Sequence, residues 1–341
     1  MTVTLSDIAA RAEVSVATVS NVLRGKGKAS LETENRVIKI ARDLGYFEHS
    51  RVRTGLLGVI SCTMPDAFTR SRNQDSSPME LASYFTAEAL EGIEDVASRS
   101  GRHIILQTLP TPTTDWEIPS MVKERLVEGV VVIGGTVPDD LILALQSRAI
   151  PLVLLFTRLK TEPVNCILAD NYQGALSAVR ELIRRGHQRI GIVNGWKATH
   201  TSEDKLAGFR EGLREGGLEF DHSLYTEGDF TFEGGYQQAQ LLLNVPGGAP
   251  TGLFVADDMM ALGAIKAIKD AGLRVPEDVA VVGFGDSGLG ANWDPPLSTV
   301  SIPKRQMGAM AVERLLELCQ GEDDKTLTIM VSPKLNLRGS C

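Results

Sequence analysis

The chain has 341 residues, of which 43% are hydrophobic and 23% are charged. This length suits about two domains, and the composition is too apolar for a disordered chain. No stretch approaches the roughly 18 apolar residues of a membrane span, and the first residues lack the pattern of a secretory signal. The four cysteines stand singly, so neither a disulfide framework nor a zinc site is expected. We expect a cytoplasmic protein with no metal, no cofactor and no membrane partner.

Charge is distributed unevenly along the chain. The formal net charge is −8, yet residues 1–57 carry nine Lys or Arg against six Asp or Glu, and the remainder is strongly acidic. A basic end on an acidic body is typical of a polyanion-binding module attached to a soluble domain. A small surplus of positive charge also arises on ordinary solvated helices, so the asymmetry alone does not identify nucleic acid as the partner.

Residues 4–45 are predicted to form three short helices. Thr4 and Asp7 have the spacing of a capping box, and Ser15 and Ser30 are expected to cap the second and third helices. A tight turn between the first two helices is what a helix-turn-helix needs to place its second helix in the major groove. The alternative is a generic three-helix cap with no role in DNA binding.

DNA contacts are expected from the second helix and from the helix N-termini. Asn21 can pair with the adenine edge in the major groove, and hydroxyls of the capping residues can hold phosphates. Arginines in the following linker can lie along phosphates or enter a narrow minor groove, although solvated linker arginines are an equally simple interpretation. The candidate DNA-binding residues are Thr4, Ser15, Val16, Ala17, Thr18, Ser20, Asn21, Ser30, Arg51 and Arg53.

After residue 55 the pattern changes to strands that alternate with helices. The apolar runs that suit buried parallel strands are 56–61, 103–107, 129–133, 151–155, 189–193, 252–256 and 279–284. Amphipathic helices are expected at 87–98, 173–185, 203–215, 233–243 and 259–271. This rhythm indicates an α/β fold of parallel sheets flanked by helices, and the number of strands favours two lobes.

An enzyme is the first competing interpretation. The segment Gly283–Gly288 follows a predicted strand and matches G-x-G-x-x-G, the dinucleotide-binding pattern. That pattern requires a helix next and then another βαβ unit, but Asn292–Pro296 does not suit a helix. We interpret the match as chance. The sequence contains no P-loop, nucleophile elbow or cluster of metal ligands, so we expect a protein that is not an enzyme.

Many segments, in order along nearly the whole chain, resemble the lac repressor (LacI/GalR) family. The resembling segments are 4–9, 14–23, 36–37, 44–46, 170–175, 186–191, 206–209, 228–230, 256–263 and 275–279. The resemblance implies a helix-turn-helix headpiece followed by a two-lobed, periplasmic-binding-protein-like core. It also implies a dimeric transcription factor that responds to a small-molecule effector.

The resemblance sets the expected domain boundaries. They are 1–47 for the headpiece, 48–56 for a short linker and 57–341 for the core, with a first lobe of 57–165 and 292–321 and a second lobe of 166–291 and 322–341. Two helices of the first lobe and the late helix 306–319 would make the dimer face. The linker is shorter than is usual in the family, and we hypothesise that its hinge helix is absent or reduced to a stub. Asn21 also departs from the family, which usually has Arg there, so base preference should differ.

The effector is expected at the carboxyl ends of the core strands, between the two lobes. The resemblance carries over the candidates Tyr84, Phe85, Thr201, Lys205, Phe230, Asp258 and Asp286. Aromatic faces and carboxylates suit a small polar ring such as a sugar. Phe85 and Phe230 are alternatively core aromatics, and Asp258 is alternatively a helix N-cap. Lys205 stands where the family usually has Arg, which puts a familiar sugar contact in doubt.

We therefore predict a homodimeric, sequence-specific regulator of transcription, a repressor, that binds a pseudo-palindromic double-stranded operator. A small polar effector would control its operator affinity. The second competing interpretation is a solute-binding protein or a ligand sensor without DNA output. Salt distinguishes the two, because DNA binding weakens steeply with ionic strength.

Overall fold

The computed structural model describes residues 3–23, 29–44, 46, 54–62, 79–109, 117–134, 137–197, 199–321 and 325–341. For residues 31, 35, 42, 62 and 79–85 it describes the backbone alone. Most of the predicted linker 48–56, including Arg51 and Arg53, lies outside the described residues, as does the hypothesis about its hinge helix. The side chains of the candidates Tyr84 and Phe85 lie outside them too.

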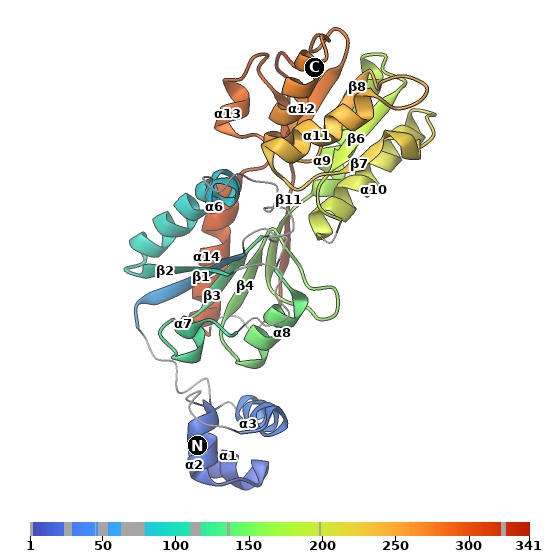
Figure 1. Ribbon diagram of the computed structural model, residues 1–341. Coiled ribbons are helices and arrows are strands. Elements are labelled where there is room, and N and C mark those ends of the chain that lie inside the picture. The colour runs from blue at the N-terminus through green and yellow to red at the C-terminus, as the bar shows by residue number, and fades with distance from the viewer. Residues whose placement is uncertain are drawn as a thin grey trace. The chain divides into compact units, whose positions relative to one another are not determined.

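The N-terminal module consists of three helices, α1 (Leu5–Ala12), α2 (Val16–Leu23) and α3 (Leu31–Asp43), as predicted (Figure 1). Apolar side chains at helical spacing turn inward, and α1 ends at Glu13, whose φ of 53° closes the helix in the left-handed region. The core of the module consists of Ile8, Ala9, Ala12, Val19, Val22, Leu23, Val37, Ile38 and Ala41. Every described residue of this hydrophobic cluster belongs to the headpiece.

The first sheet of the core has six strands in the order β11-β5-β4-β3-β1-β2. The strands are β1 (Leu56–Cys62), β2 (His103–Leu109), β3 (Val130–Ile133), β4 (Leu152–Leu155), β5 (Cys166–Ala169) and β11 (Thr328–Val331). The helices around it are α6 (Met79–Arg99), α7 (Ser120–Lys123), α8 (Asp139–Ser147) and α14 (Lys304–Gln320). Every residue of β3 and β4 is buried, as expected for central strands of a parallel sheet.

The second sheet also has six strands, in the order β12-β10-β9-β8-β6-β7. The strands are β6 (Ile190–Asn194), β7 (Tyr225–Glu227), β8 (Gly252–Val255), β9 (Ala280–Gly285), β10 (Ser298–Ser301) and β12 (Lys334–Asn336). The helices are α9 (Asn171–Arg184), α10 (His200–Glu215), α11 (Phe232–Leu243), α12 (Asp258–Asp270) and α13 (Gly288–Ala291), with a 3₁₀ turn at His222–Leu224. β12 pairs antiparallel with β10, whereas β6 with β7, β6 with β8, β8 with β9 and β9 with β10 pair parallel.

Two compact units divide the chain, and each is assembled from separate stretches of sequence. The first unit comprises residues 1–63, 89–167 and 305–328, and the second comprises 64–88, 168–304 and 329–341. Both α6 and α14 therefore pass from one unit to the other. β10 lies in the second sheet, although the predicted first-lobe range 292–321 includes it, because Ser298 to Ser301 pair with the end of β9.

All seven expected strands are present, but five further strands were not predicted. β5, β7, β10, β11 and β12 have three or four residues each. β10 reads Ser-Thr-Val-Ser, so its polar composition conceals a strand in which Ser298 and Thr299 are fully buried. The expectation that no helix and no further parallel unit follow Gly283–Gly288 is wrong, because α13 and then the parallel strand β10 follow β9. Within the described residues, no helix has the length and apolar character needed to cross a membrane.

Candidate functional site

Capping interactions fix the start of each headpiece helix. The Thr4 hydroxyl oxygen accepts from the backbone N–H of Asp7 at 3.4 Å, and the backbone N–H of Thr4 donates to the Asp7 carboxylate at 2.8 Å. The backbone N–H of Thr18 donates to Ser15 Oγ at 3.0 Å, and the N–H of Thr33 donates to Ser30 Oγ at 3.2 Å. The predicted caps at Thr4, Ser15 and Ser30 are thus confirmed, and they satisfy N–H groups that a helix start leaves unpaired.

One face of α2 is turned away from the headpiece core. Val16, Ala17 and Asn21 are exposed, with Val16 45% exposed, whereas Val19 and Val22 of the same helix are buried. Residues 16, 17, 20 and 21 lie within one face of a helix, because positions four apart are neighbours. An apolar side chain held in solvent at the start of such a helix can contact a thymine methyl group, and Asn21 can pair with a base edge.

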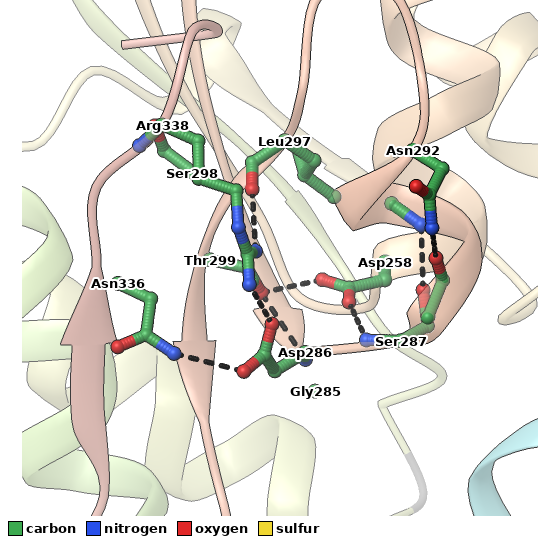
Figure 2. Close-up of polar contacts among 12 residues, drawn as sticks. Asp258, Gly285, Asp286, Ser287, Asn292, Leu297, Ser298, Thr299, Asn336 and Arg338 are labelled. Carbon is green, nitrogen blue, oxygen red and sulfur yellow. Dashed lines mark hydrogen bonds and ion pairs between the residues drawn. The ribbon is translucent and has the colours of Figure 1, made fainter.

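In the second sheet, a buried carboxylate joins the ends of three elements. Asp258, the first residue of α12, accepts from the Thr299 hydroxyl of β10 at 2.5 Å and from the backbone N–H of Ser287 at 2.5 Å (Figure 2). Burial raises the pKa of the Asp258 carboxyl, and these two hydrogen bonds oppose that shift. Gly283 makes room for the carboxylate, since a Cβ there would lie 2.5 Å from Asp258 Oδ1.

The N-cap of α12 is Asp257 and not Asp258, which corrects the alternative considered for Asp258. Asp257 Oδ1 accepts from the backbone N–H of Met259 at 2.8 Å and of Met260 at 3.4 Å. Burial, followed by the neighbouring Asp258 charge, raises the pKa of Asp257 to about 7. Of the two adjacent carboxylates, one therefore caps the helix and the other crosses to β10 and to the loop after β9.

Lys205 of α10 is buried, and its ammonium contacts groups of the protein itself. Its ammonium donates to the backbone carbonyl of Ala256 at 2.9 Å and lies 4.1 Å from the centre of the Phe284 ring. Burial lowers the pKa of Lys205 to about 8, although the charges of Asp257 and Asp258 oppose the shift. A lysine is a single donor point at this position, where a guanidinium would present a planar fork.

Asp286 ties the loop after β9 to the neighbourhood of β12. It accepts from Arg338 at 2.6 Å and from the Asn336 side-chain amide at 2.8 Å, as Figure 2 shows. Burial acts to raise the pKa of Asp286, but the hydrogen bond from Arg338, with further bonds, outweighs it and lowers the pKa. Asp286 adopts a left-handed φ of 56°, which the paired side chain stabilises.

Thr201 and Phe230 lie at the carboxyl-end side of β6. The Thr201 hydroxyl is 3.2 Å from that of Thr199, the N-cap of α10. Phe230 has a φ of 64°, is half-buried and packs against the cluster around α12. A Cβ on Gly195 would lie 2.3 Å from the Phe230 ring, so this glycine allows the ring to lie over the backbone after β6.

The structure thus brings part of the predicted effector set together. Asp258 and Asp286 meet through Thr299, whose hydroxyl also accepts a 3.4 Å bond from the Asp286 backbone N–H. The partners that sequence reasoning missed are Ser287, Thr299, Asn336 and Arg338. Thr299 had little signal, because the polar composition of residues 298–301 conceals their strand. Arg338 had none, because it is 52 residues from Asp286.

Comparison with known proteins extends these observations. Residues 4–48 match the model of bacterial regulatory proteins of the lacI family, and residues 179–341 match a periplasmic binding protein-like domain. The transcriptional repressor CytR of Escherichia coli (strain K12) is 30% identical over 341 residues, covering 99% of this chain and 96% of CytR. The repressor PurR of Klebsiella pneumoniae (strain 342) is also 30% identical, with 99% and 96% covered.

Solved structures agree with these matches. A complex of the transcriptional regulator CelR with cellobiose has a TM-score of 0.73 and 28% identity, covering 99% of this chain and all of that one. The lac repressor dimer bound to operator and an anti-inducer has a TM-score of 0.69 and 26% identity, covering 100% and 99%. The relatives are regulators and not enzymes, and the headpiece match separates the chain from solute-binding proteins that have the core alone. The chain belongs to the lacI family of bacterial regulatory proteins, DNA-binding regulators of transcription with a ligand-binding core.

Proposed function

We propose that this regulator is a homodimeric, cytoplasmic repressor that binds a pseudo-palindromic operator through α2 of each headpiece. The observation that supports this most directly is the exposure of Val16, Ala17 and Asn21 beside a fully packed headpiece core. Two headpieces related by a twofold axis present two copies of α2, so the two half-sites should be inverted repeats.

Selection of genomic fragments by the purified full-length protein, followed by sequencing, tests the proposal. At near-physiological salt we expect enrichment of a palindrome whose half-sites are separated by a fixed spacing. Affinity for the enriched sequence should fall steeply as salt is raised, because phosphate contacts release counterions. Failure to enrich any sequence, or an affinity that does not depend on salt, would contradict the operator-binding role and favour a ligand sensor without DNA output.

For the core we propose a small polar effector at the carboxyl ends of β6, β8 and β9, where Thr201 and Phe230 lie. Lys205, Asp258 and Asp286 are engaged within the chain. We therefore assign these three residues to holding the loops around the ligand. They would contact the ligand directly only if it displaced one of their partners in the protein. The position of the ligand between the two lobes, and the parts of Tyr84 and Phe85, stay predictions. Titration calorimetry with a panel of monosaccharides, disaccharides and nucleosides tests the ligand class, and the absence of heat for every member would contradict it.

A further inference from the structure

The helices α6 and α14 are in backbone contact within the first unit, directly after the boundary that each helix crosses. A Cβ on Gly92 of α6 would lie 1.8 Å from the carbonyl oxygen of Arg305, and a Cβ on Gly308 of α14 would lie 2.1 Å from that of Ala89. The boundary between the units falls after Glu88 in one helix and after Lys304 in the other. These two residues are therefore the last of the second unit on each helix.

Lys304 is a buried cation whose partners inside the protein include Gly285 and Glu88. Its side chain is 2% exposed, its ammonium donates to the backbone carbonyl of Gly285 at 2.6 Å, and it lies 2.9 Å from Glu88 Oε1. A buried ammonium is costly unless it is paired and hydrogen-bonded. The Glu88 side chain is 43% exposed, so the free-energy cost of burying a charge falls on Lys304. The Gly285 carbonyl and the Glu88 carboxylate both stabilise the ammonium in this position.

Gly285 begins the turn that holds the Asp258 carboxylate. Two residues later, the backbone N–H of Ser287 donates to Asp258, and Asp286 between them is held by Arg338 and Asn336 (Figure 2). Gly285 has a φ of 132°, a region open mainly to glycine. The carbonyl that Lys304 holds therefore belongs to the 285–287 turn itself.

From this arrangement we propose that Lys304 is a positioning residue for the effector response. It joins the 285–287 turn to Glu88 of α6, so that a change at the turn is coupled to the α6–α14 pair as it enters the first unit. The inference rests on the proposed effector function of the second sheet. Because coupling between two sites is reciprocal, operator DNA can serve as the probe of the coupling while the effector is unidentified.

The first test uses the full-length protein without DNA and follows hydrogen exchange of a peptide that contains Ser287. Glu88→Gln alters α6 alone and keeps the size of the side chain. We expect it to accelerate exchange at Ser287 about threefold or more, since a weakened Lys304 contact loosens the turn. Lys304→Met should produce a larger acceleration, and adding Glu88→Gln to it should have no further effect. Unchanged exchange at Ser287 in Glu88→Gln would overturn the proposal, even if Lys304→Met failed to fold.

The matched control is Lys269→Met. Lys269 also donates to a backbone carbonyl, that of Asp294, at 2.7 Å and pairs with a carboxylate at 2.8 Å, but its side chain is 40% exposed and lies at the surface of α12. We expect this variant to leave exchange at Ser287 unchanged.

The second test adds the selected operator. Operator binding should change exchange at Ser287 in the wild-type protein, and Lys304→Met should lose this change while it keeps operator affinity within about threefold. A wild-type protein that binds operator with no change at Ser287, or a Lys304→Met protein that retains the change, would overturn the proposal. Failure to bind any operator would instead contradict the proposed function, and the first test would still decide the role of Lys304 in the free protein.

Discussion

Three carboxylates of the second sheet lie close together in space or sequence, and each has a different role. Asp257 caps α12, Asp258 joins α12 to β10 and to the 285–287 turn, and Asp286 holds Arg338. The family resemblance assigned Asp258 and Asp286 to the ligand and did not include Asp257. Only the partners within reach distinguish a helix cap, a bond between elements and an ion pair with a distant arginine.

Asn21 should determine one base of each half-site. Asn21→Ala is expected to weaken discrimination at that base pair by about 1–3 kcal/mol, and Asn21→Arg should shift the preference from adenine towards guanine, since Arg pairs with the guanine edge. Fragment selection with each variant measures both effects. An unchanged base preference in Asn21→Arg would show that Asn21 does not contact a base.

Gly283 should be intolerant of even one added carbon. Gly283→Ala places a Cβ against Asp258 and Leu297, so we expect a loss of about 1–3 kcal/mol in the unfolding free energy of the second unit. Gly288→Ala is the matched control, because a Cβ there meets nothing within 4 Å. Urea unfolding followed by hydrogen exchange measures the loss, and equal stability of the two variants would refute the steric explanation.

Glu181 of α9 should make the second unit sensitive to acid. Hydrogen bonds from Arg184 and then Arg185 lower its pKa to about 2 against burial, which acts in the opposite direction. The pKa of Glu181 in the folded protein lies below its ordinary value of 4.5, so its contribution to stability is complete above pH 4.5 and is lost as pH falls towards 2. Glu181→Gln should remove a contribution of the order of 1–3 kcal/mol. Unfolding free energies between pH 7 and pH 2.5 test this, and a variant with the wild-type pH dependence would contradict it.

At the scale of elements, the edge strand β2 exposes apolar side chains. Leu106 is 51% exposed, and its neighbours Ile104 and Ile105 are half-buried. An exposed apolar edge strand favours pairing with another chain, which makes β2 a candidate part of the dimer face. Met307, Val312 and Leu315 of α14 are already buried within the chain. Helix 306–319 therefore has fewer apolar side chains to offer to the predicted dimer face.

A charge on β2 should therefore weaken the proposed dimer. Leu106→Lys is expected to raise the dimer dissociation constant at least about tenfold, because it places an ammonium in an apolar contact. Sedimentation equilibrium measures the constant. Leu241→Lys is the control, since Leu241 is 59% exposed on α11 of the second unit. If both variants remain dimeric to the same extent, β2 is not part of the interface.

Elements with strong apolar periodicity were predictable from the sequence, and those defined by distant partners were not. The headpiece helices and their caps depend on residues three or four positions apart, so Thr4, Ser15 and Ser30 were identified correctly. β10 and β12 are defined by pairing, β10 with β9 and β12 with β10, and not by a local apolar pattern. For the same reason the assignment of Lys205 and Asp286 to the ligand could not foresee that Ala256 and Arg338 occupy them.

At the scale of the whole molecule, each core unit requires stretches that are distant in sequence. The second sheet requires Ser340, whose hydroxyl donates to the carbonyl of Val281 and accepts from the N–H of Ser298, and it also requires β12. We expect a chain that ends after residue 333 to keep a folded headpiece and to lose protection in β9 and β10. Hydrogen exchange measured in both regions tests this, and a protected β9 in the shortened chain would contradict it.

The order of synthesis on the ribosome gives this discontinuity a further consequence. Residues 3–44 contain the three described headpiece helices α1, α2 and α3, so these helices can pack together while the rest of the chain is still being made. β9 and β10 emerge much later and then wait for β12 and Ser340, which follow the entire α14 segment of the first unit. A nascent chain thus carries a finished DNA-reading module before it has a finished core. Operator binding during translation would escape control by the effector until the last strand is in place.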